Sequence, residues 1–223
     1  MLRHFTDELE ELSHKLLDMG GLVESAIRRS VQSLADQDRD LAEQVIREEP
    51  RVNRMEMEID GMATSLLALG QPVARDLRFL TAALKINTDL ERIGDLAVHI
   101  AERSLSVMHH PLGQSLEFVP KMAALVQSML LKCLQAFVES NEDLARSVLV
   151  SDDEVDALRD SVYAKMMDLI QRDPALAPAA IDLIFVARNL ERIGDHATNI
   201  AEDVVFLVRG VDVRHHAERV ENA

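Results

Sequence analysis

The sequence predicts an all-α protein made of two tandem, pseudo-symmetric three-helix bundles, with six long helices in total. The first observation is a repeat: the hexapeptide Leu-Glu-Arg-Ile-Gly-Asp occurs at 90–95 and again at 190–195. Ten of the thirteen positions in 90–102 are identical to those in 190–202, which indicates two similar halves. The second is composition, because 48% hydrophobic residues with only 3% aromatic residues favour helices over sheets. The third is the spacing of apolar residues at intervals of three and four.

Three helices are expected in the first half. A first helix covers residues 5–34, where apolar residues form one continuous stripe. A turn at 36–38 then supplies an N-cap for a second helix over residues 41–66. Pro50 is expected to kink or restart this helix, because an interior proline removes a backbone hydrogen bond and clashes with the preceding turn. Residues 70–72 end it, and a third helix over residues 79–107 contains the first hexapeptide.

The second half repeats this plan. Apolar residues between 122 and 148 follow those between 19 and 45 at an offset of 103, and the last helix follows the third at an offset of 100. The chain is broken around His109, His110, Pro111 and Gly113. We therefore expect a first three-helix repeat over residues 1–110 and a second over residues 111–210. A polar tail at 211–223 is expected to be loosely ordered.

Charge and composition exclude several functions. With 24 basic and 39 acidic residues the chain has a net charge of −15, which repels nucleic acid and anionic lipid, so partners should be basic proteins or cations. The N-terminal residues do not have the pattern of a secretory signal, and the apolar runs are short for a membrane span, so we expect a cytoplasmic protein without direct membrane insertion. The single cysteine, Cys133, is interpreted as a small buried hydrophobe.

Each hexapeptide places two acids on one flank of its helix. Glu91 and Asp95 are i,i+4 neighbours, and Glu191 and Asp195 repeat the pair. Like charges at this spacing destabilise a helix by roughly 0.2–0.5 kcal/mol, so a compensating cation is expected. The adjacent arginines at 92 and 192 are expected to be poor candidates, because side chains at i and i+1 point apart.

The internal repeat supplies oxygen ligands on the preceding helices. Antiparallel helices place residues that are equidistant from the turn at the same level. Asp152 and Asp156 should therefore face Glu191 and Asp195, and Glu49 and Asn53 should face Glu91 and Asp95. We call the first-half group the first seam; it contains Glu49, Asn53, Glu91 and Asp95. We call the second-half group the second seam; it contains Asp152, Asp156, Glu191 and Asp195.

Four oxygen-bearing side chains from two helices predict a hard-cation site in each half. Oxygen ligands suit Mg²⁺, Mn²⁺ or Ca²⁺, and carboxylates with water also hold iron. Asn53 makes the first site one charge weaker than the second. Gly94 and Gly194, each costing about 1 kcal/mol within a helix, indicate close approach of another helix or of the ions.

Two other interpretations remain open. The acids could form solvated helix faces on a metal-free helical scaffold, or they could hold the metals of a carboxylate-bridged di-metal oxidoreductase of the di-iron type. A ferritin-like di-iron site needs two E-x-x-H motifs, and Glu11 with His14 forms one. The sequence contains no nucleophile elbow, P-loop or zinc-type Cys/His spacing, so we do not expect an enzyme.

The chain resembles the PhoU family of bacterial phosphate-uptake regulators. The resemblance covers nearly the whole chain: two three-helix repeats, the Gln71–Pro72 turn followed by residues 75–78, and both copies of E-R-I-G-D-x-A-x-x-I-A-E. It implies that Glu91, Asp95, Glu191 and Asp195 occupy the family's metal-binding positions, with the acids of the preceding helices as their partners. Asn53 departs from the pattern, which expects an acid at that position.

The same resemblance implies a function. Family members carry multinuclear iron or other divalent metals. They act as negative regulators that link the phosphate ABC transporter, through its ATPase, to a membrane sensor histidine kinase, and they are often homodimers. It also implies a cytoplasmic protein that is peripheral at the inner membrane through its protein partners.

Overall fold

Six long α-helices form the protein, as the sequence predicts. The computed structural model describes residues 2–108, 110, 116–211 and 213, and no strand occurs in these ranges. The predicted boundary around 109–113 and the tail at 211–223 therefore lie mostly outside the described residues. The helices, with a short 3₁₀-helix (η2) before the last, are α1 (Leu2–Asp36), α2 (Arg39–Gly70), α3 (Ala74–Val107), α4 (Val119–Glu139), α5 (Glu142–Arg172), η2 (Pro174–Leu176) and α6 (Ala177–Arg209).

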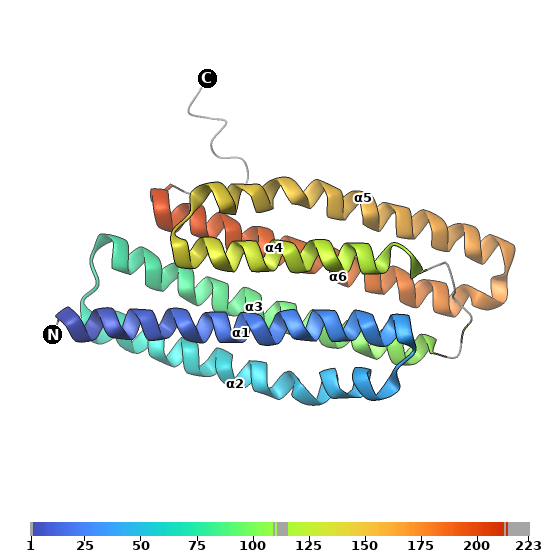
Figure 1. The fold of residues 1–223 in the computed structure, drawn as a ribbon, viewed down its shortest axis with the longest axis horizontal. Coiled ribbons are helices and arrows are strands. Elements are labelled where there is room, and N and C mark those ends of the chain that lie inside the picture. The colour runs from blue at the N-terminus through green and yellow to red at the C-terminus, as the bar shows by residue number, and fades with distance from the viewer. Residues whose placement is uncertain (1, 109, 111–115, 212, 214–223) are drawn as a thin grey trace, which may run out of the picture.

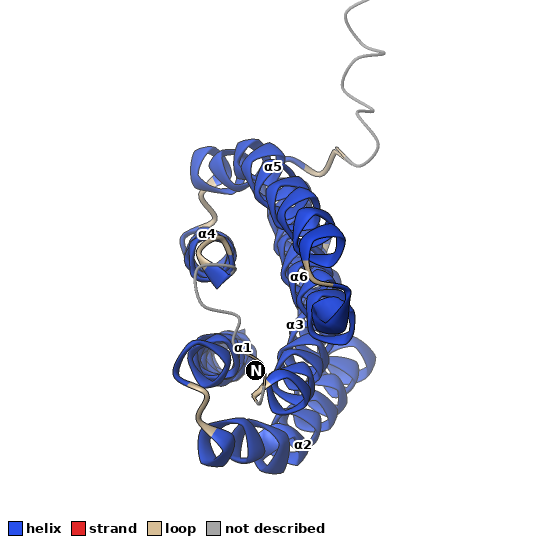
Figure 2. Ribbon diagram, turned by 90° about the vertical axis from the view of Figure 1, so that its right-hand side faces the viewer, coloured by secondary structure: helices blue, strands red, loops and turns tan. Residues whose placement is uncertain are grey.

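The helices lie roughly parallel to one long axis (Figure 1). Seen along that axis, α1, α2 and α3 form one three-helix bundle and α4, α5 and α6 form the other (Figure 2). The two bundles meet where α3 packs along α6 and, over a smaller area, where α1 packs against α4. One main hydrophobic core runs through all six helices, and a smaller cluster of Ala42, Val45 and Ala101 lies between α2 and α3. The result is an elongated molecule in which α2 and α5 lie at opposite edges.

The turns confirm the internal repeat at the level of single residues. Gln37 has a positive φ of 52° and is followed by Asp38, whose side chain accepts a hydrogen bond from the Leu41 backbone N–H at 3.0 Å. Ser140 has a φ of 50° and is followed by Asn141, which caps α5 in the same way. These equivalent residues are 103 positions apart, so the two first hairpins are built alike.

The two hexapeptide glycines mark equivalent close contacts between helices. A Cβ on Gly94 would lie 3.2 Å from Val52 of α2, and a Cβ on Gly194 would lie 3.5 Å from Val155 of α5. Val52 and Val155 are 103 positions apart. The expectation of close helix approach is therefore confirmed, and it fixes the register of each hairpin.

Of the two outcomes predicted for Pro50, a kink or a restart of the second helix, the restart is wrong. Helix α2 is continuous from Arg39 to Gly70 with Pro50 inside it. Val45 and Val52, on either side of the proline, are both buried in the protein interior. Their burial holds both segments of α2 in place, which offsets the lost backbone hydrogen bond.

Polar contacts join the two bundles along α3 and α6. Lys85 Nζ lies 2.7 Å from Asp203 Oδ1. Further along, Asp182 accepts hydrogen bonds from Arg103 at 3.0 Å and from Ser106 at 2.6 Å. The Arg103 guanidinium also lies over the Phe185 ring, 5.0 Å from its centroid. These contacts orient α3 and α6 against each other.

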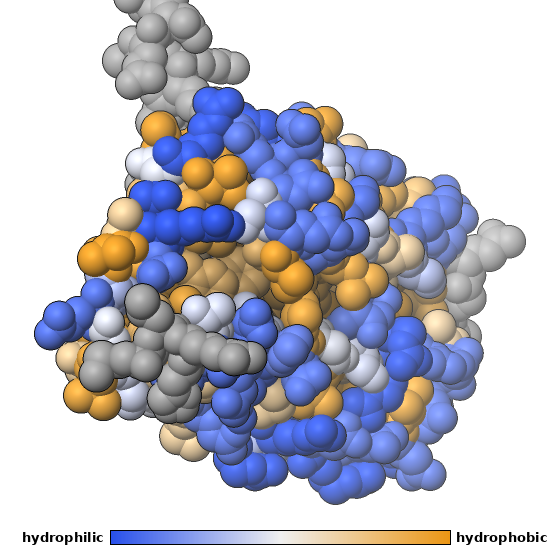
Figure 3. Space-filling view, turned by 60° about the vertical axis from the view of Figure 1, so that its left-hand side comes forward, coloured by the Kyte–Doolittle hydropathy of each residue, from blue (hydrophilic) through white to orange (hydrophobic). Residues whose placement is uncertain are grey.

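Hydrophilic residues cover most of the face seen in Figure 3, where hydrophobic residues gather in a central hollow. Within the described residues, α4 alone is long and apolar enough to span a membrane by length and composition, and 50% of its apolar stretch is buried inside the protein. Helix α4 packs against α1, α5 and α6. Its apolar character therefore has an explanation in the core, where Cys133 is also buried as expected.

Candidate metal centre

The first hairpin places acids of α2 beside those of α3. The pKa of Glu91 is raised, chiefly by burial and then by the negative charge of Asp95, with smaller effects of the same sign from Glu56 and Glu49. Glu49 and Glu56 of α2 therefore lie near enough to Glu91 of α3 for their charges to act on it, as the predicted register of the hairpin expects.

Asn53 leaves one oxygen of the first seam without a partner. Its Nδ2 donates a hydrogen bond to Glu49 Oε1 at 2.6 Å. Its Oδ1 is buried, and within the described residues no donor reaches it. A buried carbonyl oxygen without a donor is costly, and a cation satisfies such an atom as well as a donor does.

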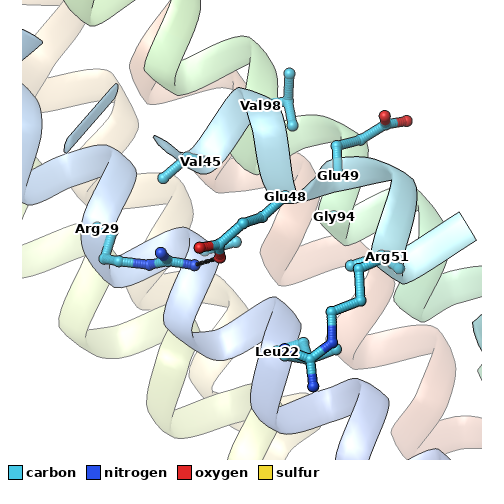
Figure 4. Close-up of a pocket in the computed structure, with 10 residues that line it drawn as sticks. Leu22, Arg29, Val45, Glu48, Glu49, Arg51, Gly94 and Val98 are labelled. Carbon is cyan, nitrogen blue, oxygen red and sulfur yellow. Dashed lines mark hydrogen bonds and ion pairs between the residues drawn. The ribbon is translucent and has the colours of Figure 1, made fainter. Parts of the chain in front are cut away.

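A small pocket of about 20 Å³ adjoins the first seam, between α1, α2 and α3. Figure 4 shows that the Glu48 carboxylate is paired with Arg29 of α1, whereas the Glu49 carboxylate points away from that pair. Arg29 lowers the pKa of Glu48 through a hydrogen bond and its charge. The neighbouring acids thus differ: Glu48 has its own cation and Glu49 belongs to the seam.

The second hairpin brings its four acids together in the same way. Burial is the main cause of the raised pKa of Asp152, followed by the charge of Asp156. The pKa of Asp195 is raised by burial and then by the charges of Glu191 and Asp152. Thr198 donates a long hydrogen bond of 3.4 Å to Asp152. The second seam is therefore a concentration of negative charge across α5 and α6.

Sequence reasoning missed Arg159, which is the cation of the second seam. Its Nη1 donates hydrogen bonds to Asp156 Oδ1 at 2.7 Å and to Glu191 Oε1 at 2.9 Å. The spacing to Asp156 is i,i+3, the ordinary spacing of an ion pair on a helix surface. That spacing makes Arg159 a candidate partner of Asp156 in the sequence, but it does not show that the same nitrogen also reaches Glu191.

Arg92, expected to be a poor candidate for the compensating cation, does contact the first seam. Arg92 Nε lies 3.4 Å from Glu91 Oε2, and its Nη1 lies 4.0 Å from Asp95 Oδ2. The long side chain folds back along its own helix, which the direction of the Cβ atoms alone does not exclude. These pairs are weak, since the Arg92 side chain is 58% exposed.

The donor chemistry of both seams fits a hard cation, because the acids and Asn53 offer oxygen atoms only. The unpartnered Oδ1 of Asn53 supports this fit in the first seam. As placed, no group of three or more acidic, histidine or cysteine side chains in the described part of the chain is arranged to hold a metal ion. The histidine His196 lies outside the seam ligands and pairs with Asp89 of α3 at 2.8 Å.

The fold and the paired seams define a class: all-helical proteins built from two three-helix repeats, each with an acidic motif on its third helix. The family model "PhoU domain" matches this chain twice, over residues 16–104 and 119–204. The chain belongs to the PhoU family.

Relatives match along almost the whole chain. The "phosphate-specific transport system accessory protein PhoU homolog" of Pseudomonas aeruginosa is 40% identical over 228 residues, covering 99% of this chain and 93% of the relative. The PhoU accessory protein of Serratia marcescens is 36% identical and covers 95% of this chain and 87% of the relative.

Solved structures agree with the fold. The crystal structure of PhoU from Pseudomonas aeruginosa matches with a TM-score of 0.89 and 38% identity, covering 93% of this chain and 100% of that chain. The phosphate transport system regulatory protein PhoU from Streptococcus pneumoniae matches with a TM-score of 0.88 and 30% identity, covering 94% and 99%.

Proposed function

We propose that this protein is a metal-binding negative regulator of bacterial phosphate uptake and phosphate-starvation signalling. In this role it couples the phosphate ABC transporter, through the ATPase of the transporter, to a sensor histidine kinase. It acts as a homodimer in the cytoplasm, and these partners hold it at the inner membrane. The observation that carries the proposal is the match to PhoU accessory proteins along 99% of the chain. Those relatives are named accessory or regulatory proteins, which supports a role without catalysis.

Charge supports regulation through contact with proteins. A net charge of −15 favours docking on a basic protein surface and disfavours anionic lipid. Such association weakens as salt rises, because the screening length is about 8 Å at physiological ionic strength.

Deletion of the gene tests the regulatory role. The deletion strain should express phosphate-scavenging genes in phosphate-rich medium, and pull-down at low salt should recover the kinase or the transporter ATPase. Normal repression in a deletion strain without a related protein would refute the proposal. A turnover lost in Glu191→Gln would favour the di-metal oxidoreductase in its place.

The metal part of the proposal assigns one cation site to each seam, with iron, manganese or magnesium as the candidate ions. Glu49, Asn53, Glu91 and Asp95 would hold the first and Asp152, Asp156, Glu191 and Asp195 the second. A divalent ion would supply positive charge to carboxylates that repel one another and that Arg92 and Arg159 compensate only in part.

Elemental analysis of protein purified without chelator or affinity-metal resin tests the metal sites. Asp195→Asn should lower metal bound at the second seam and leave the first nearly intact, because the seams lie on separate hairpins. Unchanged metal content in a protein lacking Glu91, Asp95, Glu191 and Asp195 together would show that the seams do not bind metal.

A further inference from the structure

Arg159 closes the second seam with a charged contact between two helices. A single nitrogen of its guanidinium, Nη1, contacts both Asp156 of α5 and Glu191 of α6. The other two nitrogens contact Asp160 Oδ1, Nε at 3.1 Å and Nη2 at 2.9 Å. Charge-assisted hydrogen bonds of this length are among the stronger ones in proteins. Two of the proposed ligands of the second seam are thus already bound to a cation.

The first seam has an acid at the equivalent position. The offset of 103, fixed by the contacts of Val52 and Val155 with the hexapeptide glycines, makes Glu56 the counterpart of Arg159. It also makes Asn53 the counterpart of Asp156. At five equivalent positions the first seam therefore has four acids and an asparagine, whereas the second has four acids and an arginine. At these five positions the first seam is the more negative by one charge, and Arg92, which contacts Glu91 and Asp95, is a largely exposed and weak partner.

We propose that Arg159 is a built-in competitor for the cation of the second seam, so that a divalent ion enters that seam only by displacing the guanidinium from Asp156 and Glu191. This inference rests on the proposed metal binding. It reverses the order expected from the sequence, where Asn53 alone made the first site the weaker one. The first seam fills at lower metal concentration than the second.

The surroundings of Arg159 allow the guanidinium to leave. Its side chain is 32% exposed, and Asp160, which would remain its partner, is 74% exposed and lies outside the four seam ligands. A surface pocket of about 380 Å³, lined in part by Tyr163, Ile184 and Arg188, lies beside it. A displaced guanidinium therefore keeps an ion pair and moves into solvent without disturbing the core.

Manganese titration of matched variants tests the inference. In an Asp95→Asn background, which disables the first seam, Mn²⁺ binding is followed by electron paramagnetic resonance of the free ion and by calorimetry. Adding Arg159→Gln should tighten Mn²⁺ binding by about tenfold, which equals about 1.4 kcal/mol. Arg188→Gln is the matched control, because Arg188 lines the same pocket and within the described contacts does not join the two seam acids. The control should change affinity by less than about twofold, since an exposed charge is screened.

The reciprocal variant keeps the test decisive if Arg159→Gln fails to fold. In a protein with the second seam disabled by Asp195→Asn, Glu56→Arg should weaken Mn²⁺ binding to the first seam by tenfold or more. Binding that is equal with and without Arg159, in a protein that does bind Mn²⁺, overturns the inference and leaves metal binding intact. Absence of Mn²⁺ binding in every variant, Arg159→Gln included, overturns the proposed metal function and this inference with it.

Discussion

At the scale of single residues, equivalent positions in the two repeats have different surroundings. Gly94 and Gly194 occupy the same place in the hexapeptide, yet a Cβ on Gly94 would lie 3.2 Å from Val52 whereas one on Gly194 would lie 3.5 Å from Val155. The longer distance is an ordinary van der Waals contact, and the shorter one requires the valine to move. Adding a methyl group at each of the two glycines therefore compares a crowded helix contact with an ordinary one.

We predict that Gly194→Ala stabilises the metal-free protein by up to about 1 kcal/mol, the helix propensity of alanine over glycine. Gly94→Ala should gain less, because part of that free energy is offset by the crowded contact with Val52. Denaturant unfolding in the presence of a chelator measures both. Equal stabilisation by the two variants would show that the packing difference has no energetic weight.

A second residue-scale prediction concerns Cys133. Its thiol is completely buried and has a raised pKa, because burial disfavours the thiolate. The native protein should therefore not react with a thiol reagent such as Ellman's reagent, and it should react fully in denaturant. Rapid reaction of the folded protein would contradict the packing of α4 against the core.

At the scale of elements, the end of α6 is attached to the start of α5 through Glu142. Its carboxylate accepts hydrogen bonds from Arg146 of α5 at 2.8 Å and from Arg209 of α6 at 2.9 Å. These two hydrogen bonds hold the pKa of Glu142 below its ordinary value of 4.5. The bond from Arg146 has the larger effect and the bond from Arg209 the next. The ionised form is thus favoured in the folded protein.

Glu142→Gln should therefore lower stability at neutral pH by up to about 1 kcal/mol, the usual size of exposed ion pairs. Because the folded pKa is lowered, the contribution of Glu142 is complete above pH 4.5 and is lost as the pH falls through the folded value. Unfolding of both proteins between pH 7 and pH 2.5 measures this. The difference between them should vanish at the acid end, and a constant difference would contradict the assignment.

The helices were the part of the fold that the sequence predicted best. Periodic apolar residues and the duplicated hexapeptide were sufficient to predict the six helices and the register of each hairpin. The continuity of α2 through Pro50 was not predictable, because the burial of Val45 and Val52 on either side of it is a tertiary effect. Arg159 was missed for a related reason: pairing rules locate acids across a hairpin, but they do not show which long flexible cation lies between them.

At the scale of the whole molecule, the two repeats share one main hydrophobic core. The repeats predicted at 1–110 and 111–210 both contribute helices to it. The contact between them contains Asp182, which is nearly buried and accepts hydrogen bonds from Arg103 and Ser106. A shared core with buried polar contacts favours unfolding of both repeats together.

We predict a single unfolding transition in calorimetry, with equal calorimetric and van't Hoff enthalpies. Asp182→Ala should lower the midpoint of that whole transition, at a cost of about 1–3 kcal/mol for the lost buried hydrogen bonds. Two separate transitions in the wild-type protein, or a shift confined to one half of the signal in the variant, would show that the repeats are independent domains.

The contact between α3 and α6 also decides which halves recognise each other. At the offset of 100, Lys85 corresponds to Phe185, and Asp203 corresponds to Arg103. The ion pair between Lys85 and Asp203 is therefore equivalent in position to the stacking contact between Phe185 and Arg103. Two first halves joined in this way would set Lys85 against Arg103, and two second halves would set Phe185 against Asp203. Like charges repel, and a carboxylate is repelled by the face of an aromatic ring. A first half therefore pairs with a second half, and neither half pairs with another copy of itself. If two neighbouring chains exchanged halves, each first half would again pack against a second half.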